Sequence, residues 1–296
     1  MRSTRMALTA IAAAGALTLS ACAASSPDNT TDTGAVGATT ASGDATDGAA
    51  AGDTIRIGIK FDQPGLGFQD GSEYRGFDVD VATYVTEALG YSADQIEWVE
   101  SPSAQRENLL AGGQVDMIFA TYSITDSRRE TVSFAGPYFV AGQDLLVRTD
   151  ETDIAGPEDL EGRNLCSVTG STSAERIKTD YAEGVQLVEQ PSYAECVGLL
   201  RDGTVDAVTT DDIILAGLAA QEGNAGQVRV VGNPFSTENY GVGIPKGDVE
   251  ICEQINAALT TMVEDGSWDE AVTANTEGTG YTPNAETNPP ELMACS

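Results

Sequence analysis

From residue 54 to residue 120 the chain alternates between strand-like and helix-like segments, and this order restricts the fold more than any other feature. Hydrophobic periodicity predicts, in chain order, a strand at 55–59, a helix at 77–89, a strand at 96–99, a helix at 103–110 and a strand at 115–120. Gly90 stands where a helix end favours glycine, and Ser103 is expected to cap the second helix. The β-α-β-α-β order predicts a parallel sheet with helices on both faces, which is an α/β fold.

An internal similarity indicates that this unit occurs twice. The sequence LLAGGQVD at 109–116 matches LLRDGTVD at 199–206, at an offset of 90 residues. Each segment ends a helical pattern, turns at glycine and enters a buried strand through Val-Asp. We therefore expect two lobes built alike. The alternatives are a chance match and the common chemistry of helix-to-strand turns.

Local signals place further elements in the second lobe. They predict a strand at 165–168, a helix whose capping box is Thr172 with Glu175, and a helix whose capping box is Ser192 with Glu195. Two extended segments, 143–148 and 239–244, have the pattern of crossovers between the lobes.

These signals define the domain organisation. We assign residues 53–148 and 237–296 to lobe 1 and residues 149–236 to lobe 2. A helical stripe at 249–263 is expected to pack back on lobe 1. The last residues of the chain, about fifteen and rich in Pro, Asn and Glu, are expected to be loose.

The N-terminus has the pattern of an export signal. Arg2 and Arg5 precede an apolar run at 6–19 that is too short to span a bilayer, and small residues then lead to Cys22. We interpret residues 1–21 as a lipoprotein signal peptide and Cys22 as the site of lipidation by acyl chains such as palmitate. An ordinary secretory signal with a chance cysteine is the alternative. Residues 22–52 lack large apolar side chains and are expected to be a disordered tether, so that the protein is exported and lipid-anchored to the outer face of the cytoplasmic membrane.

Composition excludes several classes of function. The chain has 15 Lys and Arg against 46 Asp and Glu, and its formal charge of −31 argues against nucleic acid and anionic lipid surfaces as partners. The absence of histidine excludes His-based catalytic triads, His–metal sites and histidine proton shuttles. No transmembrane run follows the signal, and neither a cofactor nor a metal is expected.

Four cysteines are left once Cys22 is assigned to lipid, an even number for an oxidising compartment. Four cysteines allow three pairings. We favour Cys166–Cys196 because both fall in lobe 2, and Cys252–Cys295 would then pin the C-terminal tail. Free buried thiols are the alternative.

The candidate ligand site lies at equivalent strand ends, where ligands bind in open parallel sheets. The segment TYSITDSR at 121–128 follows a lobe 1 strand, and TTD at 209–211 follows its lobe 2 equivalent. The Arg128 guanidinium suits a carboxylate and the Asp211 carboxylate suits an ammonium, so the pair complements an α-amino acid. Residues 170–172 stand at a predicted helix N-terminus, which favours an anionic or polar group.

Each of these residues also has a purely structural alternative. The alternatives are helix capping for Thr125, Asp211 and Asp212, and a surface charge beside Glu130 for Arg128. Their joint placement at equivalent strand ends favours the binding interpretation.

Three motifs in order resemble the marks of family 3 solute-binding proteins, the polar amino acid receptors of ABC importers. They are GFDVDV at 76–81, ITxxR at 124–128 and DAVxxD at 206–211, and the resemblance covers about residues 53–275. Segments 58–65 and 100–106 are further similar to actinobacterial glutamate-binding lipoproteins, in which the Cys166/Cys196 pair is also found. The resemblance implies a type II periplasmic-binding-protein-like fold, with two α/β lobes and a hinge of two crossover strands.

The resemblance also implies roles for single residues. Arg128 would grip the α-carboxylate, helped by Ser123 and Thr125, while Asp211 would take the α-ammonium and Thr172 would offer its amide from lobe 2. The expected set also includes, from the same segments, Thr121, Ser171 and Thr210. Many relatives place an aromatic platform after the first strand, from which Phe61 is slightly displaced, and another near position 103, which is Ser in this chain.

Two cations indicate which side chain the ligand carries. Lys60 follows the first strand and is expected to point into the crevice, and Arg106 opens the second helix. A spare cation there matches a γ-carboxylate and favours glutamate or aspartate over glutamine. The alternatives are a solvated strand end for Lys60 and pairing of Arg106 with Glu107 or Glu100.

We therefore expect a receptor and not an enzyme. Its lobes would close by hinge bending on an acidic amino acid, glutamate first, for delivery to an ABC permease and ATPase. A receptor for glutamine, asparagine or polar amino acids in general is the alternative. An enzyme such as a small dehydratase would need an acid or base, and the strand ends carry neither His nor Glu. A sensory module for a kinase would normally be joined to a transmembrane helix.

Overall fold

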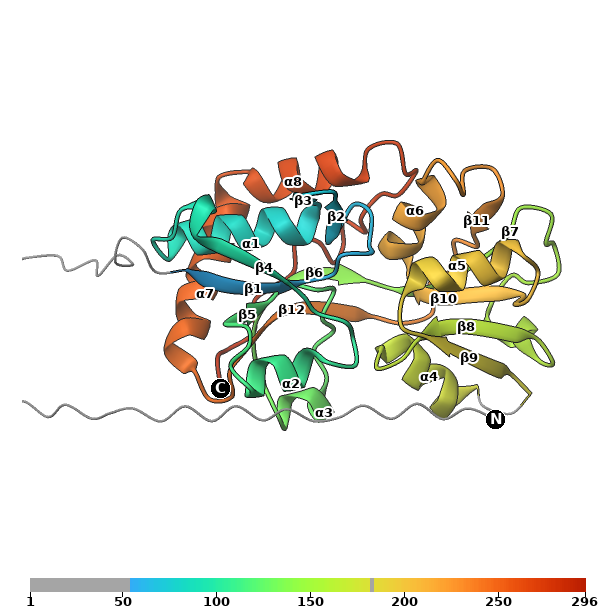
Figure 1. Ribbon diagram of the computed structural model, residues 1–296, viewed down its shortest axis with the longest axis horizontal. Helices are drawn as coiled ribbons and strands as arrows, with labels where there is room; N and C mark the ends of the chain where they lie inside the picture. Colours follow the sequence, from blue (N-terminus) through green and yellow to red (C-terminus); the bar gives the residue numbers. More distant parts are fainter. Residues whose placement is uncertain (1–53, 182–183) are drawn as a thin grey trace, which may run out of the picture. The chain divides into compact units, whose positions relative to one another are not determined.

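The computed structural model describes residues 54–181 and 184–296. The predicted signal peptide, Cys22 and the tether lie outside these residues. In the part that the structure describes, no helix has the length and apolar character needed to cross a membrane. The chain forms two five-stranded sheets and one hairpin (Figure 1).

Most strands belong to the two large sheets. The first sheet contains β1 (Ile55–Ile59), β4 (Ile96–Glu100), β5 (Met117–Ile118), β6 (Ser133–Ala141) and β12 (Glu238–Ile244). The second contains β7 (Gln143–Arg148), β8 (Asn164–Val168), β9 (Gln186–Gln190), β10 (Ala207–Asp211) and β11 (Val228–Val230). The hairpin is β2 (Phe68–Asp70) with β3 (Glu73–Arg75).

Helices connect these strands. They are α1 (Phe77–Ala88), α2 (Arg106–Ala111), α3 (Asp126–Arg129), α4 (Thr172–Asp180), α5 (Tyr193–Arg201), α6 (Asp212–Ala220), α7 (Val249–Glu264) and α8 (Ser267–Thr276), with short 3-10 turns at Ala93–Gln95 and Pro157–Leu160. The helix α1 ends as predicted, because Gly90 follows it with a φ of 93° that favours glycine.

The two sheets share one plan. The first has the order β4-β1-β5-β12-β6 and the second, read from its far edge, β9-β8-β10-β7-β11. In each, three parallel strands are followed by an antiparallel strand that enters from the other lobe, β12 in the first sheet and β7 in the second. The predicted α/β fold, with two lobes and two crossover strands, is confirmed.

The internal similarity has a structural counterpart. In lobe 1, the Asp116 carboxylate accepts a hydrogen bond from the Arg56 N–H at 2.8 Å. In lobe 2, the Asp206 carboxylate accepts one from the Asn164 N–H at 2.9 Å. Each Val-Asp pair therefore ties the start of its strand to the neighbouring parallel strand in the same way.

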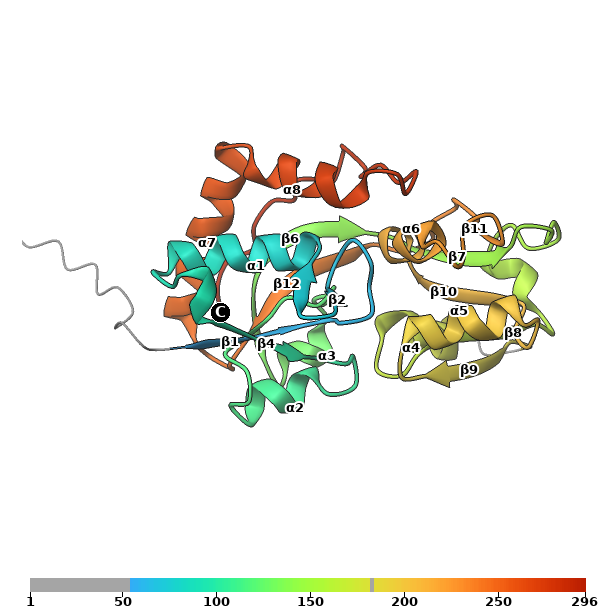
Figure 2. The same ribbon diagram turned by 45° about the horizontal axis from the view of Figure 1, so that its top comes forward.

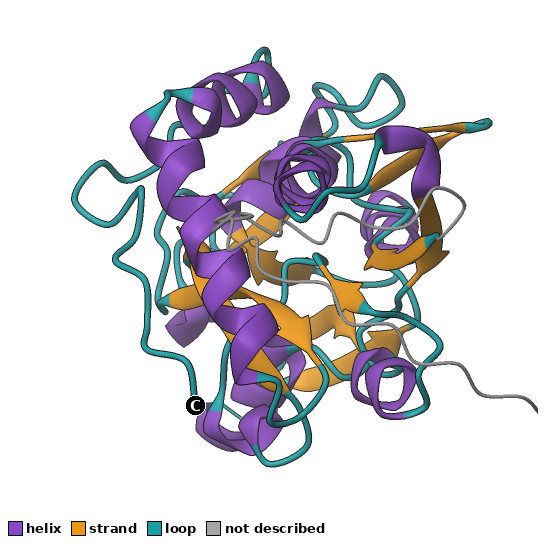
Figure 3. Ribbon diagram, turned by 90° about the vertical axis from the view of Figure 1, so that its left-hand side faces the viewer, coloured by secondary structure: helices purple, strands orange, loops and turns teal. Residues whose placement is uncertain are grey.

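Alternating side chains bury both faces of the first sheet. Met117 and Phe119 join the large core cluster, whereas Ile118 between them joins the cluster under α2. The helices α1, α7 and α8 contact one another (Figure 2), and Figure 3 shows helices on either side of the strands.

Three local predictions need correction. Strand β7 pairs with β10 and β11, so residues 143–148 belong to the second sheet and the chain passes between sheets at Gly142, not after Arg148. Ser103 is not a helix cap, because α2 begins at Arg106 after Gln105. The cap of α4 is Ser171, whose hydroxyl accepts from the Ala174 N–H at 3.0 Å, and Thr172 is the first helical residue.

The C-terminal segment was expected to be loose, and this prediction is wrong. The Asn288 amide accepts from the Val140 N–H at 2.9 Å and donates to the Val140 carbonyl at 2.8 Å. The Cys252–Cys295 disulfide holds the last residues against α7, and the Cys166–Cys196 disulfide is also present as predicted. Side-chain hydrogen bonds to the backbone and disulfides produce no hydrophobic period in the sequence, so hydrophobic patterns do not predict a segment held in this way.

Candidate functional site

The site is built on the ends of the equivalent strands β5 and β10. Thr121, just after β5, has a φ of 45°, which is uncommon for a residue other than glycine. Its N–H donates to Asp78 Oδ2 at 3.1 Å, and the Tyr138 hydroxyl donates to Asp78 Oδ1 at 2.7 Å. Burial raises the pKa of Asp78 to about 6. The GFDVDV motif therefore supplies the carboxylate that holds the turn after β5.

Arg128 stands in α3, a short helix capped by the Thr125 hydroxyl, which accepts from the Arg128 N–H at 3.2 Å. The Arg128 guanidinium is buried and donates to the Ser123 carbonyl at 2.6 Å. It also donates to the Gly170 carbonyl of lobe 2 at 3.0 Å. The capping alternative for Thr125 and the binding interpretation of Arg128 are therefore compatible.

Two guanidinium groups lie against one aromatic ring. Arg106 lies 4.1 Å and Arg128 lies 5.1 Å from the centroid of Tyr122. The Tyr122 hydroxyl donates to Glu107 Oε1 at 2.7 Å, and the same oxygen lies 3.5 Å from Arg128 Nε. Cation–π attraction and the Glu107 charge offset part of the repulsion between the two arginines.

Arg106 is 2% exposed, so its charge is almost fully removed from water. Its Nη1 donates to the Ala120 carbonyl at 2.9 Å. Its Nε has no hydrogen-bond partner among the residues that the structure describes. Burial, followed by the charge of Arg128, lowers the pKa of Arg106 to about 10. A buried donor of this kind is costly unless a ligand or water satisfies it.

Lys60 is the third buried cation, with 4% of its surface exposed. Its ammonium donates to Ser103 Oγ at 2.8 Å. Burial, and then the charge of Arg106, lower the pKa of Lys60 to about 7. The alternative of a solvated strand end is excluded.

Asp211 is the buried carboxylate of lobe 2, with 3% exposure. Its Oδ2 accepts from the Tyr240 hydroxyl at 2.6 Å, whereas its Oδ1 has no partner in the described chain. Asp211 precedes α6 but its side chain makes no capping hydrogen bond. Burial, and then the charge of Glu238, raise the pKa of Asp211 well above its ordinary value.

The N-terminus of α4 brings lobe 2 hydroxyls toward lobe 1. Ser171 caps the helix, and the Thr172 hydroxyl lies 3.4 Å from the Ser123 hydroxyl of lobe 1. Both Ser123 and Ser171 are buried, so these contacts are largely shielded from water.

A small cavity lies among these groups. Its volume is about 10 Å³, room for about one water molecule. Residues of both lobes line it: Ser103, Arg106, Thr121, Ser171, Thr172, Ser173, Tyr193, Thr210, Asp211 and Ile214. A groove of about 680 Å³ shares three of these residues and is also lined from both lobes. The small cavity as it stands is too small for an amino acid, whereas the adjoining groove is not.

The predicted residues fall into groups by their distance from this cavity. Six line it: Arg106, Thr121, Ser171, Thr172, Thr210 and Asp211. Thr125 and Arg128 line the groove, while Lys60 and Ser123 contact residues that line the cavity. Phe61 lines neither space, because its ring packs against Tyr74 with centroids 5.1 Å apart.

Sequence reasoning missed several residues of the site. Tyr193 lines the cavity, and burial raises its pKa to about 12. It stands 90 residues after Ser103, the offset of the internal similarity, so that similarity could have found it. The same offset relates Thr121 to Asp211. Glu107 was considered only as a partner of Arg106, and it contacts Arg128 and Tyr122 instead.

The chemistry of the site is that of charge recognition. Lys60, Arg106 and Arg128 are the only lysine and arginine side chains that are buried in the described part of the chain. Arg106 lines the small cavity together with Asp211, Arg128 lines the adjoining groove, and Lys60 contacts Ser103, which lines both. In residues 54–181 and 184–296, no group of three or more acidic or cysteine side chains is arranged to hold a metal ion.

Comparisons with known proteins agree with this chemistry. A profile of the bacterial extracellular solute-binding proteins, family 3, matches residues 55–275. The glutamate-binding protein GluB of Corynebacterium efficiens is 49% identical over 232 residues, which cover 75% of this chain and 78% of GluB. The glutamine-binding protein GlnH of an ABC transporter of Bacillus subtilis is 36% identical over 221 residues, covering 74% of this chain and 79% of GlnH.

A solved structure has the same fold. An ancestral arginine-binding protein bound to glutamine superposes with a TM-score of 0.69 at 35% sequence identity. The match covers 75% of this chain and 96% of that protein.

Proposed function

The chain belongs to the family 3 bacterial extracellular solute-binding proteins, and we propose that it is a receptor for an acidic amino acid, L-glutamate, which it delivers to an ABC importer. The fold is that of the type II periplasmic binding proteins, and relatives of this chain are named for binding amino acids. The choice of glutamate and the roles of single residues are the parts that we propose.

The observation that carries this proposal is that three buried cations, Lys60, Arg106 and Arg128, lie at the small cavity or at the residues and groove that border it, and none of the three has a buried ion-pair partner in the described part of the chain. An α-amino acid with a neutral side chain offers one carboxylate, for which Arg128 is sufficient. Lys60 and Arg106 would then have no anionic partner in a buried space, which is unfavourable. A second carboxylate on the ligand would neutralise them and satisfy the free Nε of Arg106.

In the proposed complex each charged group of the ligand has a partner. Arg128 binds the α-carboxylate, assisted by hydroxyl groups of the β5–α3 segment and of the α4 N-terminus. Asp211 binds the α-ammonium through the oxygen that lacks a partner in the described chain. Lys60 and Arg106 bind the side-chain carboxylate. Closure of the lobes then removes these ion pairs from water, and they become stronger in the less polar interior.

The name of GluB supports glutamate, whereas the name of GlnH supports glutamine as the competing ligand. The two ligands differ only in a carboxylate against an amide, so Lys60 is the residue that should distinguish them. We further propose export and a lipid anchor at Cys22, followed by the tether at 22–52, from the pattern of the N-terminal sequence alone.

Calorimetric titration with L-glutamate and L-glutamine tests the ligand. We expect the wild-type protein to prefer glutamate. We expect Lys60→Met to weaken glutamate binding by about ten- to a hundredfold, the value of a hydrogen bond to a charged group, and to change glutamine binding by less than about threefold. Lys246→Met is the matched control, because Lys246 is exposed and outside the site. A Lys60→Met variant with an unchanged preference would contradict the role of this lysine.

Arg128 and Asp211, which we propose to bind the α-carboxylate and the α-ammonium, have a separate test. Arg128→Ala and Asp211→Ala should each abolish binding of both ligands, because each leaves one buried charge of the amino acid without a partner. Binding that survives both substitutions would show that the ligand is held elsewhere.

A further inference from the structure

The loop between β1 and β2, residues 60–67, contacts lobe 2 through Asp62, Pro64 and Leu66. Asp62 Oδ2 accepts a hydrogen bond from the Tyr193 N–H at 3.2 Å. This N–H is one of the free donors of the first turn of α5, where the helix dipole also favours a negative charge. Loop 60–67 therefore binds the start of a lobe 2 helix.

The second contact is between backbones, at Gly217 in α6. A Cβ atom on Gly217 would lie well under 3.0 Å from the carbonyl oxygen of Pro64, far inside any van der Waals contact. Gly217 lies inside the helix, where glycine is less favourable than alanine. The helix itself gives no reason for glycine at this position, whereas the approach of Pro64 does.

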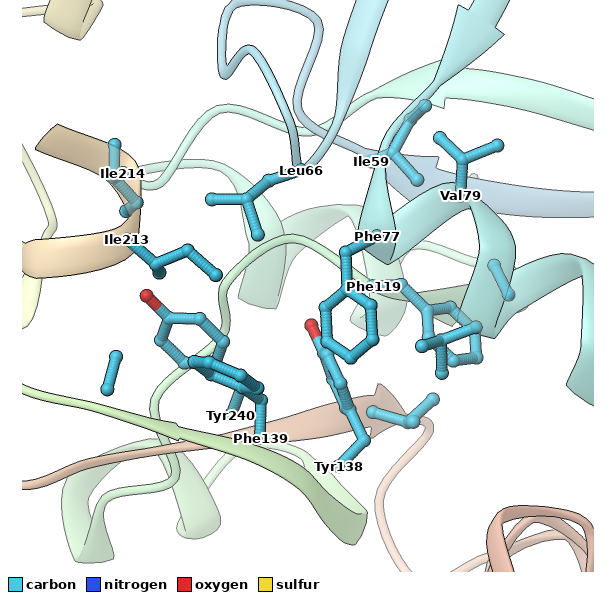
Figure 4. Close-up of a cluster of buried hydrophobic side chains, with 14 of the residues drawn as sticks. Ile59, Leu66, Phe77, Val79, Phe119, Tyr138, Phe139, Ile213, Ile214 and Tyr240 are labelled. Atoms are coloured by element: carbon cyan, nitrogen blue, oxygen red, sulfur yellow. The ribbon is translucent and has the colours of Figure 1, made fainter. Parts of the chain in front are cut away.

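Loop 60–67 also connects this contact to the ligand site. Its first residue, Lys60, donates to Ser103, and the Thr121 hydroxyl donates to the Gln63 side chain at 3.2 Å. Leu66 is fully buried, and its side chain points toward Ile213 and Ile214 of α6 (Figure 4). Loop 60–67 therefore lies between the lobe 1 side of the ligand site, where its first residue is Lys60, and α6 of lobe 2.

We infer that Gly217 is a positioning residue: its missing side chain lets loop 60–67, which follows directly from the strand end that carries Lys60, rest on α6 when the lobes close. The inference rests on the proposed function, in which the lobes close on an amino acid. Gly170 approaches Ala104 across the cleft in a similar way, but its φ of 78° strains any substitution there. Gly217 has no such strain and gives the cleaner test.

The chain offers a matched control in Gly198. It also lies inside a lobe 2 helix of nine residues, and beyond the neighbouring backbone of that helix no atom of the described chain comes within 4 Å of its Cβ position. Gly217→Ala and Gly198→Ala should gain the same helix propensity, so a difference between the two variants reports on the contact with Pro64. Only Gly217→Ala should impair closure.

Two measurements with L-glutamate as the probe test closure. We expect Gly217→Ala to raise the Kd at least about tenfold, and Gly198→Ala to change it less than about twofold. In small-angle X-ray scattering, the wild type and Gly198→Ala should contract on adding L-glutamate, and Gly217→Ala should not. If Gly217→Ala binds and contracts as Gly198→Ala does, the inference is wrong.

Hydrogen exchange in the unliganded protein separates this inference from the proposed ligand. If the wild type does not bind L-glutamate, the ligand assignment fails. The exchange rate of the Tyr193 amide then tests the role of Gly217 by itself, because this measurement needs no ligand. Faster exchange of this amide in Gly217→Ala than in Gly198→Ala supports the inference, and equal exchange overturns it. Should Gly217→Ala fail to fold, Asp62→Ala removes another contact of loop 60–67; weaker L-glutamate binding then supports the inference, and unchanged binding overturns it.

Discussion

Lys60 combines a titratable charge with almost complete burial, and this makes its proton part of ligand binding. Its pKa of about 7 in this structure results first from burial and then from the neighbouring Arg106, with Asp62 acting in the opposite direction. A carboxylate placed next to Lys60 raises this pKa again. Above pH 7 the unliganded protein loses the proton, and binding of an acidic ligand has to take it up.

Glutamate affinity should therefore fall relative to glutamine affinity as the pH rises above about 7. The expected change in the ratio is up to about tenfold per pH unit, because one proton is taken up with glutamate only. Titrations of both ligands from pH 6 to pH 9 measure it. The ratio is the useful quantity because in the proposed complex Asp211 contacts the ammonium of either ligand, so that the titration of Asp211 affects both affinities alike.

Lys60→Met serves as the control for this pH dependence, since it removes the titrating group. The ratio of glutamate affinity to glutamine affinity of this variant should not change with pH. A wild-type ratio that stays constant from pH 6 to pH 9 would contradict proton uptake by Lys60.

For single residues, the sequence predicts the charged side chains of the candidate site better than the hydrogen-bond partners of those side chains. Asp211 was predicted because it ends the buried strand β10, and Arg128 because it stands in the segment that follows the equivalent strand β5. The contact between Lys60 and Ser103 joins residues 43 positions apart, and Ser103 had been expected to cap a helix. The cap moved because Ser103 binds the buried ammonium, a tertiary contact that helix-capping patterns do not contain.

Among the elements, the C-terminal segment departs most from its prediction. Asn288 bonds both backbone groups of Val140 on β6, and Asn256 of α7 donates to the Met293 carbonyl at 3.0 Å. The segment also reaches lobe 2, because the Tyr281 hydroxyl donates to Asp212 at 3.3 Å. A polar segment without an apolar period can thus be held by hydrogen bonds and a disulfide, neither of which hydrophobic patterns predict.

Asn288→Ala should lower the free energy of unfolding by about 2 kcal/mol or more. The substitution leaves the N–H and the carbonyl of Val140 without partners in a buried place, and each unpaired group costs about 1–3 kcal/mol. Urea denaturation followed by circular dichroism measures the change.

Asn108→Ala is the matched control, because it removes the same amide group from an exposed position on α2, where alanine favours the helix. It should not lower the free energy of unfolding by more than about 0.5 kcal/mol. If Asn288→Ala is no less stable than Asn108→Ala, the hydrogen bonds between Asn288 and Val140 do not contribute to stability. The C-terminal segment would then be loosely held, as the sequence predicts.

For the molecule as a whole, the exchange of strands between sheets explains how two similar lobes form one receptor. Each sheet accepts as its fourth strand a strand that enters from the other lobe, β12 or β7, so the two crossovers are part of both lobes. The repeated helix-turn-strand unit was predicted from eight positions of sequence. The membership of β7 was not, because an extended apolar strand has the same pattern in either sheet.

In the described part of the chain most carboxylates are exposed, but a few are buried. The buried ones change the free energy of unfolding with pH. Burial raises the pKa of Asp78 and of Asp212 to about 6, from an ordinary value of 3.8. Between these two pH values the folded protein binds more protons than the unfolded chain. The stabilisation from this difference is complete below pH 3.8 and is lost as the pH rises through 6.

We therefore expect the protein to be more stable at pH 5 than at pH 7, the opposite of the common behaviour of proteins whose carboxylates are paired. A pKa raised by two units corresponds to about 2–3 kcal/mol per carboxyl group in full, of which about 1 kcal/mol is lost between pH 5 and pH 7, and relief of repulsion among surface carboxylates acts in the same direction. Asp78→Asn should flatten this dependence, because the amide does not titrate, whereas Asp269→Asn, at an exposed position, should preserve it. Urea denaturation of the three proteins at pH 4.5 to 7.5 measures the slopes. If the slope of Asp78→Asn equals that of Asp269→Asn, the loss of stability toward neutral pH comes from the surface charge and not from the buried carboxylate that holds the turn after β5.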